Sequence, residues 1–91
     1  MTKSVFTSRY HRLRELLIQS RKDADLSQSQ LARSLKKPQS YVSKYERGER
    51  RLDVIEFLDI AASIGADPVE LVRSLNHSGA NHDGKRRKRF S

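Results

Sequence analysis

Residues 26–52 carry two short helix signals in close succession, and this feature constrains the fold more than any other in the chain. Ser27 is followed three residues later by Gln30, a spacing at which each side chain can accept a hydrogen bond from a free amide of the first turn. Leu26 and Leu31 flank that pair at the positions of a hydrophobic staple. A helix is therefore predicted to begin at Ser27, and its buried face is expected to comprise Leu31, Ala32 and Leu35.

A Lys-Lys pair interrupts this helix and a proline follows it. The fixed φ of Pro38 suits the first position of a helix, so a second helix is predicted to open there. Val42 and Tyr45 repeat at helical spacing and are expected to face inward, whereas Gly48 is suited to end the helix in a left-handed conformation. The outer face then carries hydrogen-bonding side chains only: Gln39, Ser40, Ser43 and Lys44.

An ordinary helical hairpin with a solvent-exposed polar face would show the same periodicity. The identities of the residues must therefore distinguish it from a functional motif. The pattern L-S-Q-x-x-L-A-x-x-L, followed by P-Q-S-Y-V-S-K-Y-E-R-G-E-R-x-L, resembles the helix-turn-helix of the lambda-repressor-like (Cro/repressor, Xre) family. The resemblance extends through about residues 10–75. It implies an all-α, compact five-helix DNA-binding domain in which the second helix of the motif enters the major groove.

The resemblance also assigns roles to side chains. The base-reading candidates are the four residues of the outer face, Gln39, Ser40, Ser43 and Lys44. Glutamine can pair bidentately with adenine and lysine can donate to guanine, so Gln39 and Lys44 are the first choices.

Backbone contacts are expected from Gln28, which matches a phosphate-binding position in the family at a helix N-terminus. Arg47, Arg50 and Arg51 follow the recognition helix and are also expected to meet phosphates, which set register rather than sequence. Tyr41 is expected either to lie against the DNA backbone or a thymine methyl, or to fill a gap between helices.

Two further expectations concern the frame of the motif. The resemblance implies a structural ion pair between Arg21 and Glu46. Lys36 stands where the family usually has glycine, at a turn that often needs positive φ. A lysine in that conformation costs on the order of 1–2 kcal/mol, so either the turn is reshaped or the strain is retained.

Helical periodicity extends to both sides of the motif. A first helix is predicted from Thr7 or Ser8 to about Ala24, and its apolar stripe is Tyr10, Leu13 and Leu17, with Phe6 just ahead. Asp53 with Glu56 repeats the capping box and predicts a fourth helix to about Ile64, with Phe57, Leu58, Ala61 and Ile64 on its inner face. Asp67-Pro68 with Glu70 predicts a short fifth helix marked by Leu71, Val72 and Leu75.

The charge of the chain is uneven. The 91 residues carry a formal net charge of +8 and a pI near 10.3, which favours a polyanionic partner. Residues 1–51 hold 13 basic and 5 acidic side chains, whereas residues 52–76 hold one basic and five acidic ones. The predicted helix-turn-helix therefore lies in the basic half.

The expected organisation is a flexible arm at residues 1–6, where Lys3 could touch a phosphate, a DNA-binding domain at 7–76 and a flexible basic tail at 77–91. The tail ends in KRRKRFS. It could attract phosphates without sequence preference, act only as a solubilising end, or serve as a nuclear signal in a eukaryote.

Several classes of protein are disfavoured. The chain has no glycine-rich phosphate loop, no nucleophile elbow and no cysteine, and its histidines His11, His77 and His82 are scattered. No enzyme activity, cofactor or metal is expected. No apolar run has the length of a membrane span and no signal peptide is recognisable, so a cytoplasmic protein is expected.

The predicted function is sequence-specific binding of double-stranded DNA by a transcriptional regulator, expected to be a repressor and a homodimer on a palindromic operator. Val72, Leu75 and Ile60 are candidates for the dimer contact, although they could equally complete the monomer's core. The alternative is an antitoxin or adaptor of the same fold that binds a partner protein. RNA binding through the basic face is a third option.

Overall fold

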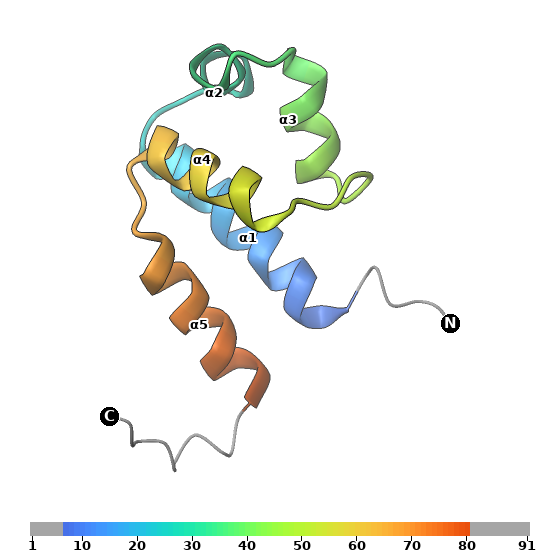
Figure 1. Cartoon of the computed structure of the whole chain (residues 1–91), viewed down its shortest axis with the longest axis vertical. Helices are drawn as coiled ribbons and strands as arrows, with labels where there is room; N and C mark the ends of the chain where they lie inside the picture. Colours follow the sequence, from blue (N-terminus) through green and yellow to red (C-terminus); the bar gives the residue numbers. More distant parts are fainter. Residues whose placement is uncertain (1–6, 81–91) are drawn as a thin grey trace.

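The computed structural model describes residues 7–80, with side chains described to Asn76, and contains no strand within that range. Phe6 and Lys3 lie outside it, as does the KRRKRFS segment. Five α-helices follow one another, as the all-α prediction required: α1 (Ser8–Asp23), α2 (Gln28–Leu35), α3 (Gln39–Glu46), α4 (Val54–Ile64) and α5 (Pro68–Ala80). Figure 1 shows α2 and α3 together at one end of the molecule and α5 at the other, with α1 running between them.

The helix starts are capped largely as their sequences predict. In α2 the Ser27 hydroxyl accepts from the Gln30 amide at 3.0 Å, and the Gln30 side chain accepts from the Ser27 amide at 2.8 Å. The same reciprocal pair forms between Asp53 and Glu56 at the start of α4. Two of the three predicted capping pairs are therefore confirmed, and each satisfies two amides that the helix itself leaves without partners. At the start of α5 the Asp67 carboxylate accepts instead from the Val69 amide at 2.9 Å.

Each of the first four helices is followed, within two positions of its last residue, by a left-handed residue. These residues are Asp25, Lys36, Gly48 and Gly65, with φ values of 65°, 60°, 82° and 73°. After α2, the Lys37 amide donates to the Ala32 carbonyl at 2.9 Å and the Lys36 amide to the Arg33 carbonyl at 3.1 Å, which is the pattern of a Schellman motif. The turn between α2 and α3 thus keeps the conformation that usually selects glycine, and Lys36 retains the strain.

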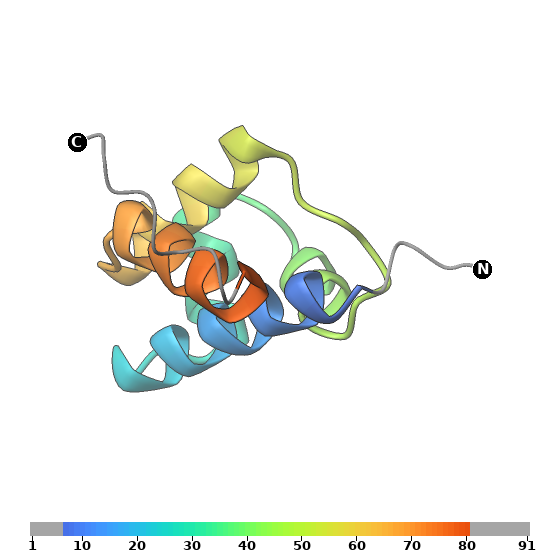
Figure 2. The same cartoon turned by 90° about the horizontal axis from the view of Figure 1, so that it is seen from below.

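The core lies where all five helices meet. Its fully or nearly fully buried side chains are Tyr10, Leu17, Leu31, Ala32, Val42, Tyr45, Ile60, Ala61, Ile64 and Leu71. The predicted inner faces of α2 and α3 are confirmed by the burial of Leu31, Ala32, Val42 and Tyr45. Figure 2, seen from below, shows α5 lying alongside α1, and α1 also contacts α3.

Three details differ from the sequence predictions. Pro38 is the N-cap of α3 rather than its first helical residue, because its ψ of 155° is extended. α5 continues to Ala80, four residues beyond Asn76, where linker composition had suggested its end. The helical ladder continues through His77 and Ser78 because these residues only weakly disfavour a helix that is already formed.

The third difference concerns α4. Leu58 was expected on the inner face but is 42% exposed, whereas Ile60 was a candidate for a dimer contact but is fully buried. The buried face consists of Ile60, Ala61 and Ile64 with half-buried Phe57, which is the i, i+3, i+4, i+7 stripe. Leu58 lies about 100° away from Phe57 around the helix, so it faces solvent.

Candidate nucleic-acid interface

The outer face of α3 presents the predicted base-reading side chains. Gln39, Ser40 and Lys44 are exposed, and Ser43 is half-buried. The Ser43 hydroxyl accepts from the Arg47 guanidinium at 2.9 Å. The N-terminal turn of α3 therefore offers both donors and acceptors to a ligand that approaches it end-on.

Gln39 is held by residues of α2. Its Oε1 accepts from the Ser29 hydroxyl at 2.9 Å, and its Nε2 lies 3.5 Å from Gln28 Oε1. Gln28 in turn donates through Nε2 to Glu46 Oε1 at 2.8 Å. Since a carboxylate only accepts, this last bond determines which end of the Gln28 amide faces Gln39. The Gln39 amide still has one free lone-pair site and one free N–H, which a bidentate contact to adenine requires.

Arg21 and Glu46 form an ion pair at the inner end of these hydrogen bonds. Arg21 Nε donates to Glu46 Oε2 at 2.8 Å and Arg21 Nη2 to Glu46 Oε1 at 3.1 Å, while Arg21 Nη1 donates to the Leu26 carbonyl at 2.8 Å. Both residues are buried. The pair links α1 to the C-terminus of α3, and through Gln28 to the start of α2.

The arginines that follow α3 already have partners within the chain. Arg47 pairs with Glu49 at 2.8 Å, and the hydrogen bond to that carboxylate is the main reason why the pKa of Arg47 is raised. Arg50 makes two hydrogen bonds to Glu56. The guanidinium carbon of Arg51 lies 4.2 Å from the centre of the Tyr10 ring. Of these arginines, Arg47 and Arg51 are exposed and Arg50 is half-buried.

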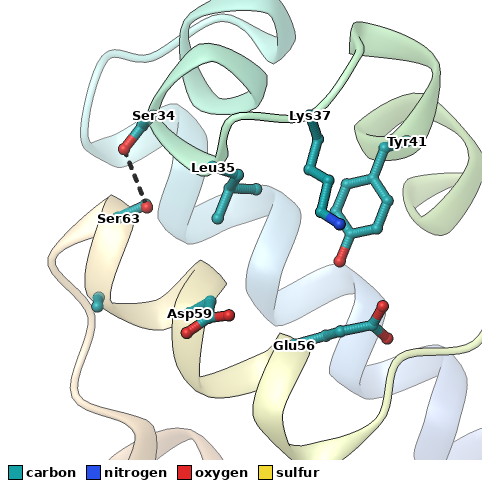
Figure 3. A pocket seen from close by; sticks show the side chains of 8 residues that line it. Ser34, Leu35, Lys37, Tyr41, Glu56, Asp59 and Ser63 are labelled. Carbon is teal, nitrogen blue, oxygen red and sulfur yellow. Dashed lines mark hydrogen bonds between the residues drawn. The ribbon is translucent and has the colours of Figure 1, made fainter.

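Tyr41 fills a gap between helices, the second of its two predicted placements. Its ring packs edge-on against Tyr45 at 5.8 Å between centroids. Lys37 Nζ lies 5.3 Å and the Arg50 guanidinium 4.8 Å from the ring centre. Figure 3 shows its hydroxyl pointing toward the carboxylate of Glu56 on α4.

Some contributors to this region were not predicted from the sequence. Arg14 on α1 donates through Nη1 to the Glu46 carbonyl at 2.6 Å. The Tyr10 hydroxyl donates to the Arg50 carbonyl at 3.4 Å and accepts from the Leu52 amide at 3.2 Å. These contacts join segments 32–42 residues apart in sequence, so no local spacing could have identified them.

A polar groove lies behind the motif, where α2 and α3 face α4. It has a volume of about 340 Å³ and is lined by Ser34, Leu35, Lys37, Tyr41, Glu56, Asp59, Ala62 and Ser63. A hydrogen bond of 3.0 Å joins the hydroxyls of Ser34 and Ser63 across one end of it (Figure 3). Residues 7–76 contain no cluster of three potential metal ligands.

Comparison with known proteins agrees with this geometry. A helix-turn-helix family profile matches residues 17–71, which span α2 and α3 with the helices that support them. A solved structure, an XRE-family-like protein from Pseudomonas syringae pv. tomato strain DC3000, is 46% identical with a TM-score of 0.77. The similarity covers 80% of this chain and 89% of that one. The chain belongs to the XRE family of helix-turn-helix proteins.

Membership in the XRE family makes the chain a DNA-binding regulator and not an enzyme. The five-helix fold without strands among residues 7–80 is that of the XRE-family neighbour. The search of curated proteins found no match. Among the described helices, none combines the length and the apolar character needed to cross a membrane.

Proposed function

We propose that this XRE-family protein is a transcriptional repressor that binds a palindromic DNA operator as a homodimer and reads the major groove with α3. The observation that carries the proposal is the exposed polar face of α3 with Gln39, Ser40 and Lys44, on which the Gln39 amide is oriented by Gln28 and Ser29. Preorganised polar groups lose less entropy when they bind a base edge. Gln39 and Lys44 are assigned to bases, with Ser40 and Ser43 beside them.

Backbone contacts are assigned to Gln28, Arg47 and Arg51, which flank α3 on either side. The two arginines are exposed, and the ion pair of Arg47 with Glu49 lies at the surface, where its loss has a small effect on stability. The two arginines can therefore exchange their present partners for a phosphate, and Gln28 would contact one without leaving Glu46 and Gln39.

The experiment is selection of random duplex DNA by the purified protein at near-physiological salt, with wild type, Gln39→Ala and Lys44→Ala in parallel. Gln19→Ala is the matched control, because Gln19 is an exposed glutamine on α1 whose side chain bonds Asp23. We expect a palindromic consensus that each test variant relaxes at its own position and that the control leaves unchanged. Binding without a consensus, lost as salt rises, would refute sequence-specific recognition.

The homodimer is proposed to form through an apolar groove between α4 and α5. The groove has a volume of about 350 Å³ and is lined only by Val54, Phe57, Leu58, Pro68, Val69 and Val72. Contiguous exposed apolar surface of this kind marks interaction sites. Of the three residues predicted as dimer contacts, Val72 lines this groove, whereas Leu75 is half-buried and Ile60 is fully buried in the core.

The dimer is tested by the sedimentation of Leu58→Glu and Val69→Glu, with Gln19→Glu as the control for an added surface charge. We expect both groove variants to become monomers that bind a single half-site weakly. If wild type is itself a monomer and retains a partner protein through this groove, the antitoxin or adaptor alternative replaces the homodimer.

A further inference from the structure

The segment that joins α3 to α4 contains an arginine whose charge is already neutralised. Arg50 Nη1 donates to Glu56 Oε1 at 3.0 Å and Arg50 Nη2 to Glu56 Oε2 at 2.7 Å, a bidentate arrangement. Arg50 Nη1 also donates to the Arg51 carbonyl at 3.1 Å. To bind a phosphate, this guanidinium would have to leave one anion for another and expose the Glu56 carboxylate near the DNA backbone.

Glu56 is the centre of these contacts. Besides Arg50, its carboxylate accepts from the Asp53 amide at 2.9 Å, and the hydroxyl of Tyr41 points toward it (Figure 3). These hydrogen bonds, chiefly the one from Arg50, lower the pKa of Glu56 to about 2. One carboxylate in the first turn of α4 therefore holds Arg50 of the connecting segment, and Arg50 in turn lies against the ring of Tyr41 on α3.

Tyr41 carries this restraint to the recognition helix. It lies in the N-terminal turn of α3 with Gln39 and Ser40, and its ring is enclosed by Lys37, Arg50 and Tyr45. Partial burial is the main reason why the pKa of Tyr41 is raised. Any movement of this turn relative to α4 would break the contact with Glu56 and the stacking on Arg50.

We propose that Glu56, Arg50 and Tyr41 form a clamp that sets the angle at which α3 enters the major groove, and that Arg50 is a positioning residue rather than a phosphate contact. This inference rests on the proposed DNA-binding function. It gives Arg50, which the sequence placed at the DNA backbone, and Tyr41, for which the sequence left a backbone contact open, a role exerted through Gln39 and Ser40.

The two roles of Arg50 predict opposite effects of Glu56→Gln. If Glu56 only restrained a phosphate-binding arginine, its neutralisation would free Arg50, remove a negative charge and strengthen binding. If the clamp positions α3, the same variant weakens binding to the selected operator although it makes the protein more positive. We expect the affinity for the selected operator to fall about tenfold, which corresponds to the loss of one or two well-placed base contacts.

The experiment measures binding of wild type, Glu56→Gln, Arg50→Gln and Tyr41→Phe to the selected operator, to an operator changed at the Gln39-dependent position and to unrelated duplex, over a range of salt. Arg47→Gln is the matched control for a lost phosphate contact. It should reduce the slope of log affinity against log salt concentration by about 0.9 per lost phosphate contact, and it should weaken binding to all three duplexes alike. The clamp variants should keep the wild-type slope and lose discrimination between the two operators.

A second readout uses the free protein. Amide hydrogen exchange of residues 39–42 should accelerate in Glu56→Gln and Tyr41→Phe, while Arg47→Gln should leave it unchanged. Tyr41→Phe retains the packed ring, so it keeps the inference testable if the other variants unfold.

Three results would overturn the clamp. They are stronger operator binding by Glu56→Gln, a reduced salt dependence of binding in Arg50→Gln, and unchanged amide hydrogen exchange in Glu56→Gln and Tyr41→Phe. Absence of any consensus for wild type would instead refute the proposed function, and the exchange data would still decide whether the clamp exists.

Discussion

The guanidinium of Arg21 and the carboxylate of Glu46 face each other through two hydrogen bonds of 2.8 and 3.1 Å in the interior of the domain. Their side chains are only 11% and 5% exposed. Gln28 donates to a further lone pair of Glu46, and a further N–H of Arg21 donates to the Leu26 carbonyl. Removing one partner of such a buried, hydrogen-bonded ion pair destabilises a protein far more than replacing both partners by apolar residues.

We therefore expect Glu46→Gln and Arg21→Met each to lower the free energy of unfolding by about 3–5 kcal/mol, because each leaves one buried charge without its counter-ion. The double variant Arg21→Met with Glu46→Leu should recover much of that loss. Urea denaturation monitored by circular dichroism measures all three.

The exposed pair Arg47–Glu49 supplies the control, since its side chains are 56% and 53% exposed and its N···O distance is the same 2.8 Å. Glu49→Gln should change stability far less than Glu46→Gln, because solvent screens an exposed ion pair. Equal losses at Glu46 and Glu49 would show that burial does not set the strength of these pairs.

Gly48 and Gly65 are both left-handed, yet they should respond differently to alanine. A Cβ on Gly48 would lie 3.1 Å from the guanidinium carbon of Arg14, whereas a Cβ on Gly65 would meet nothing within 4 Å. Both variants carry the left-handed penalty of about 1–2 kcal/mol. Gly48→Ala should lose more, because Arg14 must move and its bond to the Glu46 carbonyl is disturbed. Thermal unfolding of the two variants compares them, and an equal loss would contradict the Arg14 contact.

Lys36 is a position at which glycine should improve stability. Its φ of 60° penalises any side chain, and its side chain is exposed. Lys36→Gly should raise the free energy of unfolding by about 0.5–1 kcal/mol, the relief of strain less the extra chain entropy of glycine. Lys36→Ala removes the same charge but keeps the Cβ, so it should give no such gain. A similar gain in both variants would attribute the effect to charge instead of backbone strain.

Acid should weaken the domain partly through Glu56. Its pKa is about 2 in the folded protein, chiefly because Arg50 donates to it, against about 4.3 in an unfolded chain. A carboxyl group whose pKa is lower in the folded than in the unfolded protein stabilises the fold at pH values above the unfolded pKa. This stabilisation is lost as pH falls from about 5 toward 2. The side chain is 21% exposed, so we expect about 1–2 kcal/mol after solvent screening.

Denaturation curves measured between pH 5 and pH 2 test this dependence. Glu56→Gln should lose stability at pH 7 and show a weaker decline in acid than wild type. Arg50→Gln should also decline less, because it removes the main cause of the lowered pKa. A decline as steep as that of wild type in both variants would place the acid sensitivity elsewhere.

Much of the local structure followed from short-range chemistry. The capping pairs Ser27–Gln30 and Asp53–Glu56 predicted where α2 and α4 begin, since each involves residues three positions apart. The inward faces of α2 and α3 followed from helical periodicity. The exposed polar face of α3 is the complement of that pattern, and the family resemblance then assigned it to DNA.

The tertiary structure decided which of several compatible roles a side chain has. The sequence prediction placed Leu58 on the inner face and left Ile60 open between the core and a dimer contact, whereas the packing of α4 against its neighbours buried Ile60 and left Leu58 at the groove. Tyr41 was compatible with DNA or with a gap between helices, and its contacts with Glu56 and Arg50 come from α4 and the segment before it. Local sequence determines helix ends and faces because those interactions span a few residues, whereas partners 15–40 residues apart are chosen by how the helices pack.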